Sequence, residues 1–359
     1  MSSYEIRLKP STTVFPIGEW IFISHQSGKC KVPIDMEDEV RDICRGISTK
    51  NLTLGHRNLV RILRERGLLD EHIRTPREIS PRFERLISYL ARFEPKQDRA
   101  SSFGKLHNTR VCVVGLGGLG TWMVQSLVML GIRRLILIDG DVIEISNFNR
   151  QLFWREEDIG RAKVEVVIER LHQWDPSLEI ESHCQYITSS DVVRHILFES
   201  KPDLTISCAD QPLWYIRRWI NEACISLNIP FVVVAGSKVG PLVVPGQTAC
   251  IECQWMQVKR DYPQYERDLN ACLSIPQPVR GSIVSEPMST VGAASQDIFR
   301  FVTGVELPRS MGAELVLSNA SSELHPITKD PSCSVCGNLP MKGGDLTHGC
   351  THGKRADRS

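Results

Sequence analysis

The chain has 359 residues, of which 42% are hydrophobic and 24% charged, as in soluble globular proteins that bury a sizeable core. Its formal net charge of +1 gives no overall attraction toward nucleic acid or a membrane surface. Because no apolar run has the length of a bilayer span or a secretory signal, we expect a cytoplasmic protein whose twelve cysteines bind metal or react rather than form disulfides.

Residues 1–75 predict a small α+β module of winged-helix-like type. Short β-type runs, separated by Pro and Gly turns, occur at Tyr4–Leu8, Trp20–Ser24 and Cys30–Val32. We expect Asp35 to cap a helix that ends toward Gly46. A second helix is predicted because four apolar residues would share one of its faces: Leu59, Ile62, Leu63 and Leu68.

Residues 76–108 form a basic, proline-punctuated connector. It predicts one helix, with Ser80 at the N-cap and Pro81 in the first helical position. The apolar side of that helix consists of Phe83, Leu86, Ile87 and Leu90.

From Arg110 onward, apolar strands alternate with amphipathic helices. The predicted strands are Val111–Val114, Leu135–Ile138, Glu179–His183, Asp203–Cys208 and Phe231–Val234. The predicted helices are Trp122–Leu130, Glu156–Trp174, Asp191–Phe198 and Leu213–Leu227. Such alternation predicts an α/β fold with a Rossmann-like, doubly wound and mainly parallel sheet over residues 109–338. We expect the polar tail, residues 339–359, to be disordered.

A glycine-rich turn follows the first strand of this domain and opens a helix. It matches G-x-G-x-x-G through Gly115, Gly117, Gly118 and Gly120. Residues without a Cβ allow backbone N–H groups to approach phosphate closely. Asp139 ends the second strand, where a carboxylate can accept hydrogen bonds from ribose hydroxyls. The pattern suits NAD, FAD or ATP, and a purely structural turn is the alternative.

Four further polar residues favour ATP: Asn147, Arg150, Lys163 and Asp210. The two cations suit a triphosphate, and a second acid at the carboxyl edge of the sheet suits Mg²⁺. Taken singly, Arg150 and Lys163 could be solvated helix charges, and Asp210 could be a helix N-cap ahead of Pro212. Their joint position at strand ends makes ATP the preferred hypothesis.

Two Cys-x-x-Cys pairs predict a zinc site. They are Cys250 with Cys253 and Cys333 with Cys336. Two thiolates at this spacing bind one metal from a tight turn, and two such turns complete a tetrahedral shell. Because protein would fill all four positions, the predicted zinc is structural. A redox role for one pair is the alternative.

The run from Arg110 to Gln211 resembles the ThiF/MoeB adenylating enzymes, which are related to ubiquitin-activating enzymes. The matching motifs are GLGGLG, the Asp139-x-Asp141 pair, SNFNRQ, GRAKVE and Cys-Ala-Asp210. The resemblance implies that Asp139, Asp141, Asn147, Arg150, Lys163 and Asp210 contact ribose, phosphates and Mg²⁺, with Asp210 holding the metal. It also implies that Arg85, in Arg82-Phe83-Glu84-Arg85, reaches the ATP site of a partner subunit in a homodimer. Phe83 replaces the tyrosine that the family carries there, and Leu86 also departs from its pattern.

The residues ahead of this element resemble the peptide-modifying branch of the family, which includes enzymes of microcin C and pantocin A maturation. The resemblance implies that residues 1–75 recognise the leader of a precursor peptide and that the enzyme activates a carboxyl group of that peptide, such as a glutamate side chain. It also implies a crossover loop within Gln254–Gly281, where Cys272 is a candidate reactive thiol. A small-residue-rich helix at Met288–Phe301 suits a dimer interface.

Three alternatives remain open. The first is activation of the C-terminal Gly-Gly of a sulfur-carrier protein, against which the added N-terminal module argues. The second is a DNA-binding regulator, suggested by the cluster of Arg57, Arg61, Arg64 and Arg66, although these also suit a solvated helix face or an acidic peptide. The third is a Rossmann oxidoreductase. We expect no nucleic-acid or membrane partner.

Overall fold

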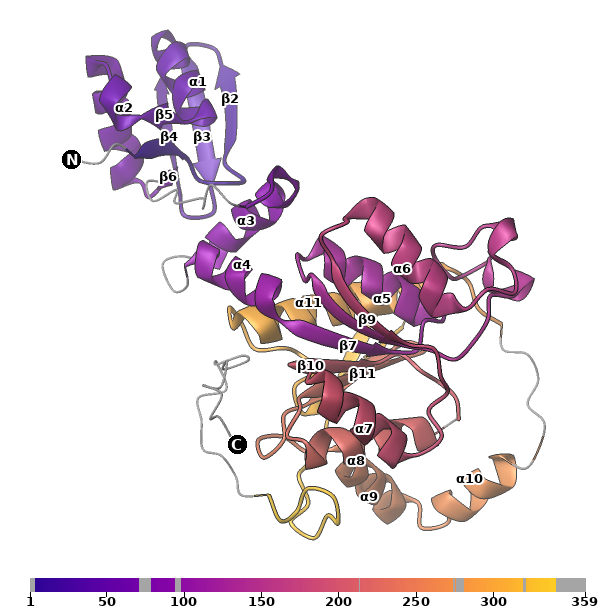
Figure 1. Cartoon of the computed structure of the whole chain (residues 1–359). Helices are drawn as coiled ribbons and strands as arrows, with labels where there is room; N and C mark the ends of the chain where they lie inside the picture. The colour runs from indigo at the N-terminus through magenta and orange to yellow at the C-terminus, as the bar shows by residue number, and fades with distance from the viewer. Residues whose placement is uncertain are drawn as a thin grey trace, which may run out of the picture. The chain divides into compact units, whose positions relative to one another are not determined.

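The chain folds into two compact units, residues 1–103 and residues 104–359 (Figure 1). The computed structural model describes residues 4–70, 79–93, 98–212, 214–273, 275, 281–318 and 321–339. None of the helices in these ranges has both the length and the apolar character that crossing a bilayer requires.

Within residues 4–70, the N-terminal unit contains two small antiparallel sheets and two α-helices, which confirms the predicted α+β module. One sheet has the order β5 (Ile47–Ser48), β1 (Glu5–Leu8), β6 (Leu69–Asp70). The other is the meander β2 (Thr13–Ile17), β3 (Trp20–His25), β4 (Gly28–Pro33). Alternate residues of β3 point inward, where Ile23 packs with Ile43 of α1 (Glu37–Arg45) and Leu59 of α2 (Leu54–Glu65).

The predicted helix cap at Asp35 is wrong. Ile34–Met36 forms a short 3-10 turn that leads directly into α1, and Met36 occupies the N-cap without a side-chain hydrogen bond. Acidic residues in the first turn of α1 take over this role, because they interact favourably with the helix dipole. By contrast, α2 has a full capping box between Thr53 and His56.

In its described residues, 79–93 and 98–108, the connector contains two α-helices rather than the one predicted. The Ser80 hydroxyl accepts a hydrogen bond from the Arg82 backbone N–H, as expected for an N-cap, and leads into α3 (Glu84–Leu90). The second helix is α4 (Arg99–Asn108). Its small and polar residues hide its periodicity in the sequence, although Phe103 and Leu106 are buried.

The second unit is built on an eight-stranded sheet. The strand order is β14 (Ser322–Pro326), β13 (Ala313–Leu317), β12 (Lys238–Val243), β11 (Phe231–Ala235), β10 (Leu204–Ser207), β7 (Arg110–Val114), β8 (Arg134–Ile138), β9 (Glu179–His183). The five strands from β11 to β9 are parallel, and the remaining three are antiparallel. The mainly parallel, Rossmann-like fold and its five predicted strands are confirmed.

Helices cover both faces of this sheet (Figure 1). On one side lie α5 (Gly118–Met129), α6 (Lys163–Trp174) and α11 (Ser285–Thr303), and on the other lie α7 (Ser190–Ser200) and α8 (Tyr215–Ser226). This double cover explains why β7, β8 and β11 are rich in apolar residues and why even Thr205 and Ser207 of β10 are buried, whereas the edge strand β9 is partly exposed.

The segment after the first cysteine pair is more ordered than predicted. It contains α9 (Ile251–Asp261) and α10 (Tyr265–Leu273), and its role as a crossover loop stays a prediction. Charged residues interrupt the periodicity of α9 in the sequence, while Trp255 and its neighbours are anchored in the core. Residue 274 and residues 276–280 lie outside the described ranges, as do residues 340–359 of the predicted disordered tail.

Candidate nucleotide site and metal centre

Two glycines of the turn after β7 are required by packing. Gly115 has φ of +91°, and a Cβ there would lie 2.7 Å from the backbone nitrogen of Ala209. A Cβ on Gly120 would lie 1.8 Å from the carbonyl oxygen of Gly115. The turn therefore packs tightly between the start of α5 and the residues that follow β10.

The other two glycines of the turn do not serve packing. A Cβ on Gly117 would meet no atom within 4 Å, and the nearest atoms to one on Gly118 would be those of the Arg150 side chain, from 3.4 Å. Gly117 is the N-cap of α5, a twelve-residue helix whose first N–H groups lack intrahelical partners. The turn thus leaves open space beside free N–H donors and a cation, which is an arrangement suited to phosphate.

Asp139, directly after β8, fixes the backbone around this turn. Its carboxylate accepts hydrogen bonds from the Leu116 N–H at 2.5 Å and from the Asp141 N–H at 2.7 Å. Burial nevertheless raises the pKa of Asp139, and those two hydrogen bonds only partly offset the shift. A carboxylate has about four acceptor positions. Asp139 can therefore hold the turn and still accept from a ribose hydroxyl.

Lys163 is a buried cation, not a solvated helix charge. Its side chain is 6% exposed, and its ammonium group donates to Asp141 at 2.8 Å. The hydroxyl of Tyr186, after β9, also hydrogen-bonds Asp141, which raises the pKa of Tyr186. Tyr186 could not be predicted as part of the site, because a single exposed tyrosine in a loop belongs to no motif.

Asn147 and Arg150 lie in the segment between β8 and α6. Asn147 is buried, and its side-chain amide oxygen accepts a hydrogen bond from the Glu144 backbone N–H at 3.2 Å. The Arg150 guanidinium donates to the Ser146 carbonyl at 2.7 Å and to the Asn149 side chain at 2.9 Å. Asn147 therefore shapes the segment, while Arg150 is held beside Gly118 at the start of α5.

A buried acid missed by the sequence analysis holds the rest of this segment. Asp158 accepts from the Arg155 backbone N–H and from the Arg161 and Arg170 side chains, at 2.7 to 3.0 Å. The segment ends at Lys163, whose backbone N–H donates to the Asp141 carbonyl at 3.0 Å. Asp158 thus stabilises the segment between β8 and α6, which ends at Lys163 and positions this residue in the site.

Asp210 lies exposed just beyond β10, next to Ala209 and the glycine turn. It is not a helix cap, because α8 begins at Tyr215 with Trp214 at the N-cap. The chain winds from β7 to β8 and β9 on one side and returns to β10 on the other. This topological switch point, between β7 and β10, is where doubly wound folds bind ligands at the carboxyl ends of their strands.

The structure brings nearly all of the predicted nucleotide residues to that edge of the sheet. Arg85 differs, because it is an exposed residue of α3 in the N-terminal unit. Cys272 is exposed on α10 and lies outside the four-cysteine cluster. A cavity of about 310 Å³ lies at the opposite, amino ends of β7, β8 and β9, where its charged lining residues pair with one another, so it is not a candidate for this site.

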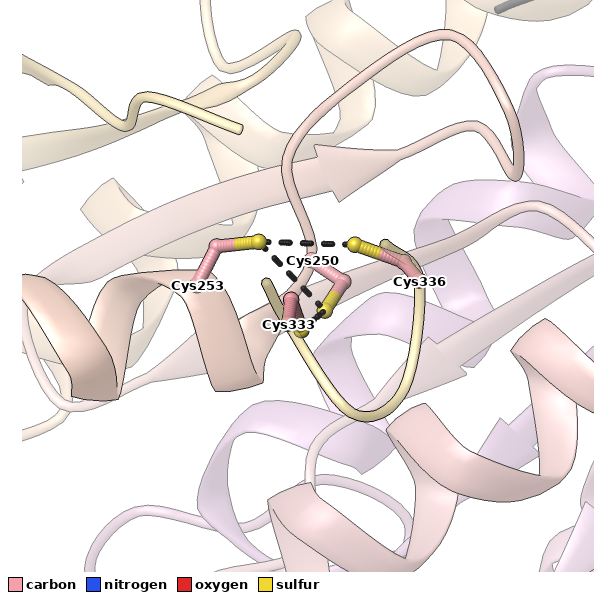
Figure 2. Close-up of side chains that lie close together, drawn as sticks. All are labelled: Cys250, Cys253, Cys333 and Cys336. Atoms are coloured by element: carbon pink, nitrogen blue, oxygen red, sulfur yellow. Dashed lines mark hydrogen bonds between the residues drawn. The ribbon is translucent and has the colours of Figure 1, made fainter. Parts of the chain in front are cut away.

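The four predicted zinc ligands meet in the core of the second unit (Figure 2). Cys250 and Cys253 lie at the start of α9, and Cys333 and Cys336 lie in the loop after β14. Sulfur–sulfur distances are 4.0 Å for Cys250–Cys253, 3.7 Å for Cys250–Cys333 and 3.4 Å for Cys253–Cys336. Tetrahedral zinc with bonds of about 2.3 Å requires sulfur atoms about 3.8 Å apart, so the cluster fits the ion.

The surroundings of the cluster also favour metal binding. The Asp330 N–H donates to the Cys253 sulfur at 3.4 Å. The pKa of the Cys253 thiol is lowered by hydrogen bonds from Cys250 and Cys336, while the pKa values of Cys250 and Cys336 are raised. A metal that displaces these shared protons would bind the sulfur atoms as thiolates. With four buried sulfur ligands, such a site leaves no coordination position for a substrate.

These features define a Rossmann-like fold with a phosphate-suited glycine turn and a four-cysteine cluster that fits a metal ion. The model of the ThiF family matches residues 88–335, and the chain belongs to that family. Its class of reaction is that of the ATP-dependent adenylyltransferases.

Similar proteins agree with this assignment. Protein HesA of Leptolyngbya boryana is 29% identical over 272 residues, which are 74% of this chain and 87% of HesA. The sulfur carrier protein ThiS adenylyltransferase of Escherichia coli K12 is 28% identical over 239 residues, 65% of this chain and 88% of that protein. The crystal structure of E. coli MccB with AMPCPP and MccA covers 93% of this chain and 100% of MccB, with a TM-score of 0.69 and 22% identity. The fold of MccB thus extends over both units.

Proposed function

We propose that this enzyme adenylates a carboxyl group of a ribosomally made precursor peptide during maturation of a peptide natural product. The observation that carries the proposal is the convergence of the open Gly117 turn, the buried Lys163 and Asp210 at the switch point of the sheet. Such a site suits ATP and a second anionic substrate. We keep a cytoplasmic location as part of the proposal.

The N-terminal unit supports a peptide as the substrate. Its two small sheets have short edge strands, and an edge strand can add a peptide strand through main-chain hydrogen bonds. The likeness to MccB includes this unit, and MccB was crystallised with MccA. We therefore assign recognition of a leader segment to residues 1–75 as part of the proposal.

The residues of the site suggest how the reaction would proceed. A carboxylate oxygen attacks the α-phosphorus of ATP, the bond to the β-phosphate oxygen breaks, and pyrophosphate leaves. Arg150 and Lys163 lie on the glycine-turn side, where they would stabilise charge on the phosphates. Asp210 would hold Mg²⁺, which neutralises charge on the phosphate oxygens when bound. A nucleophile then attacks the acyl carbon and releases AMP.

Arg85 would complete the site from a partner subunit in a homodimer. It is an exposed arginine on α3, and arginines supplied in this way are worth roughly 10³–10⁵ in rate in other phosphoryl-transfer systems. Mixing Arg85→Ala with Lys163→Met protein tests it. Each variant alone should be inactive, and subunit exchange should restore activity, because one site of the mixed dimer keeps both residues. No recovery in a demonstrably exchanged mixture would contradict a role in trans.

The activated group is proposed to be a glutamate side chain. Nucleotide product analysis with Mg²⁺, ATP and synthetic peptides from short reading frames beside the gene tests substrate and reaction together. Peptide-dependent AMP and pyrophosphate that disappear when the glutamates are changed to glutamine would support the proposal. ADP as product would instead indicate phosphorylation of the carboxylate.

A second candidate is adenylation of the C-terminal Gly-Gly of a sulfur-carrier protein. The 28% identity to the E. coli ThiS adenylyltransferase over 88% of that protein favours it. The same product analysis with a sulfur-carrier protein discriminates the two. AMP formation with the carrier but with no peptide would make this candidate the function.

A further inference from the structure

Three aromatic rings form a cluster beyond Asp210. Trp214 precedes α8, Trp255 belongs to α9 and Tyr265 begins α10, and their ring centroids are 5.9 to 6.1 Å apart in edge-to-face packing. Trp214 has φ of +73° and ψ of −46°, which is a strained conformation for a bulky residue. Strain of this kind persists where the surrounding packing enforces it, and such residues gather at functional sites.

Two consecutive arginines of α8 cover this cluster but differ in their partners. The Arg217 guanidinium lies 5.7 Å from the Trp214 ring centroid, and that of Arg218 lies 5.0 Å from the Trp255 centroid. Arg218 is neutralised by Glu252 at 3.1 Å. Within the described part of the chain, the Arg217 guanidinium makes no hydrogen bond or ion pair and has only its ring contact.

Arg217 faces the same end of the sheet as the nucleotide residues. It stands in the first turn of α8, which follows the carboxyl end of β10. Burial lowers the pKa of Arg217, and the charges of Glu314, Tyr265 and Asp210 partly offset that shift. Glu314 is already paired with Lys238 at 2.8 Å. Arg217 is therefore partly removed from solvent and lies over an aromatic ring, but it has no carboxylate partner among the described residues. Such an arginine can bind an external anion.

The geometry points to Arg217 as the residue that binds and orients the substrate carboxylate. Arg150 and Lys163 lie on the β8 side of the glycine turn, whereas Arg217 lies on α8, beyond Asp210 on the β10 side. Adenylation must bring together two anions, a triphosphate and a carboxylate, and the cations occupy two sides of Asp210. The Trp214 and Tyr265 rings offer apolar surface for the rest of the peptide. This inference rests on the proposed function.

The test is to compare Arg217→Gln with Arg218→Gln in the full-length, zinc-loaded enzyme. With the peptide that supports AMP formation, Arg217→Gln should raise the peptide KM and lower kcat/KM for the peptide roughly 10- to 100-fold, because a charged hydrogen bond is lost. The KM for ATP and the melting temperature should stay unchanged, and Arg217→Lys should recover part of the activity. Arg218→Gln should lower the melting temperature and leave the peptide KM unchanged.

A binding measurement keeps the inference testable if no peptide supports turnover. With saturating Mg²⁺ and AMPCPP occupying the phosphate side, saturation-transfer NMR would compare N-acetylglutamate α-amide with N-acetylglutamine amide. The wild-type protein should bind the carboxylate and not the amide, and Arg217→Gln should lose that preference. A preference that survives in Arg217→Gln, or an ATP KM that rises instead of the peptide KM, would overturn the assignment. Carboxylate binding at Arg217 without any peptide-dependent AMP would overturn the proposed function alone.

Discussion

The second unit contains two contrasting sites. One is the nucleotide edge, which is the carboxyl end of the sheet at β7 and β10, and the other is the four-cysteine cluster. At the nucleotide edge, polar groups converge around space that the chain does not fill, since a Cβ on Gly117 would meet nothing within 4 Å. At the cysteine cluster, four buried sulfur atoms lie within 4.8 Å of one another inside the core. The first site is open and charged, whereas the second is closed and has the geometry for a single ion.

The difference assigns separate roles to the two sites. A closed sulfur shell contributes to folding, because binding of the metal is coupled to order in the loops that supply the ligands. An open edge contributes to chemistry, because its cations retain capacity for ligands. Changes at the edge should therefore affect activity with little effect on stability, and changes at the cluster should do the reverse. The following four predictions test this comparison, beginning with the largest effect.

Lys163→Met should separate activity from stability most strongly. We expect kcat/KM for ATP to fall roughly 10³-fold, as when one preorganised charge stabiliser is removed from a catalytic site. The melting temperature should change little, because Asp141 is half exposed and can be solvated after the loss of Lys163. Steady-state kinetics and thermal unfolding on the same preparation check both outcomes. A large loss of stability with activity retained would reverse the assignment.

Cys333→Ser should show the opposite pattern. Loss of one thiolate should release the metal and lower the melting temperature by roughly 10 °C, because structural zinc contributes several kcal/mol to folding. Metal analysis and calorimetry provide the measurement. The matched control is Cys184→Ser, since Cys184 is an exposed cysteine outside the cluster, and it should keep its zinc. Equal metal content in both variants would exclude Cys333 as a ligand.

Two glycines of one turn should respond differently to alanine. Gly120→Ala places a Cβ 1.8 Å from the Gly115 carbonyl oxygen and should destabilise the protein by about 1–3 kcal/mol. Gly117→Ala meets no protein atom and should fold normally, but its methyl group would occupy ligand space and raise the KM for ATP about tenfold or more. Denaturant unfolding and ATP titration of the pair measure both effects. If Gly117→Ala binds ATP normally, phosphate does not approach the turn there.

The smallest effect is a pH dependence at Asp139. Burial raises the pKa of this carboxyl in the folded protein above its value in the unfolded chain. The folded state therefore holds the proton more tightly, and the contribution of Asp139 to stability decreases as pH rises through the range of its titration. Thermal unfolding between pH 4 and 7 should show the wild type losing stability relative to Asp139→Asn as pH rises. A difference that stays constant with pH would contradict the shift.

Much of this architecture could be predicted from the sequence, because the parallel strands and the two candidate sites correspond to patterns within short stretches of the chain. The parallel strands were visible as apolar runs, since both of their faces are buried. The nucleotide and zinc residues carried spacing signals, because turns that approach phosphate or metal need glycine or paired cysteines at fixed intervals.

Other features depended on long-range contacts. The antiparallel strands β12, β13 and β14 pair with neighbours up to 78 residues away, such as Lys238 with Val316, and their sequences do not show it. In α9 and α10, Trp255 and Tyr265 pack against Trp214, a contact between segments that are about 40 to 50 residues apart in the sequence. The proposed role of Arg217 could not be predicted from the sequence. Arg217 and its neighbour Arg218 are the same residue type, and they differ only in that Arg217 lacks a carboxylate partner among the described residues.

The most direct test of adenylation follows oxygen atoms. A substrate peptide labelled with ¹⁸O in its glutamate carboxyls is incubated with enzyme, Mg²⁺ and unlabelled ATP, and the products are analysed by mass spectrometry. Because the carboxylate oxygen attacks the α-phosphorus, we predict one ¹⁸O atom in each AMP released and none in pyrophosphate. Label in inorganic phosphate together with ADP, or AMP without label, would contradict activation of the peptide carboxyl as an adenylate.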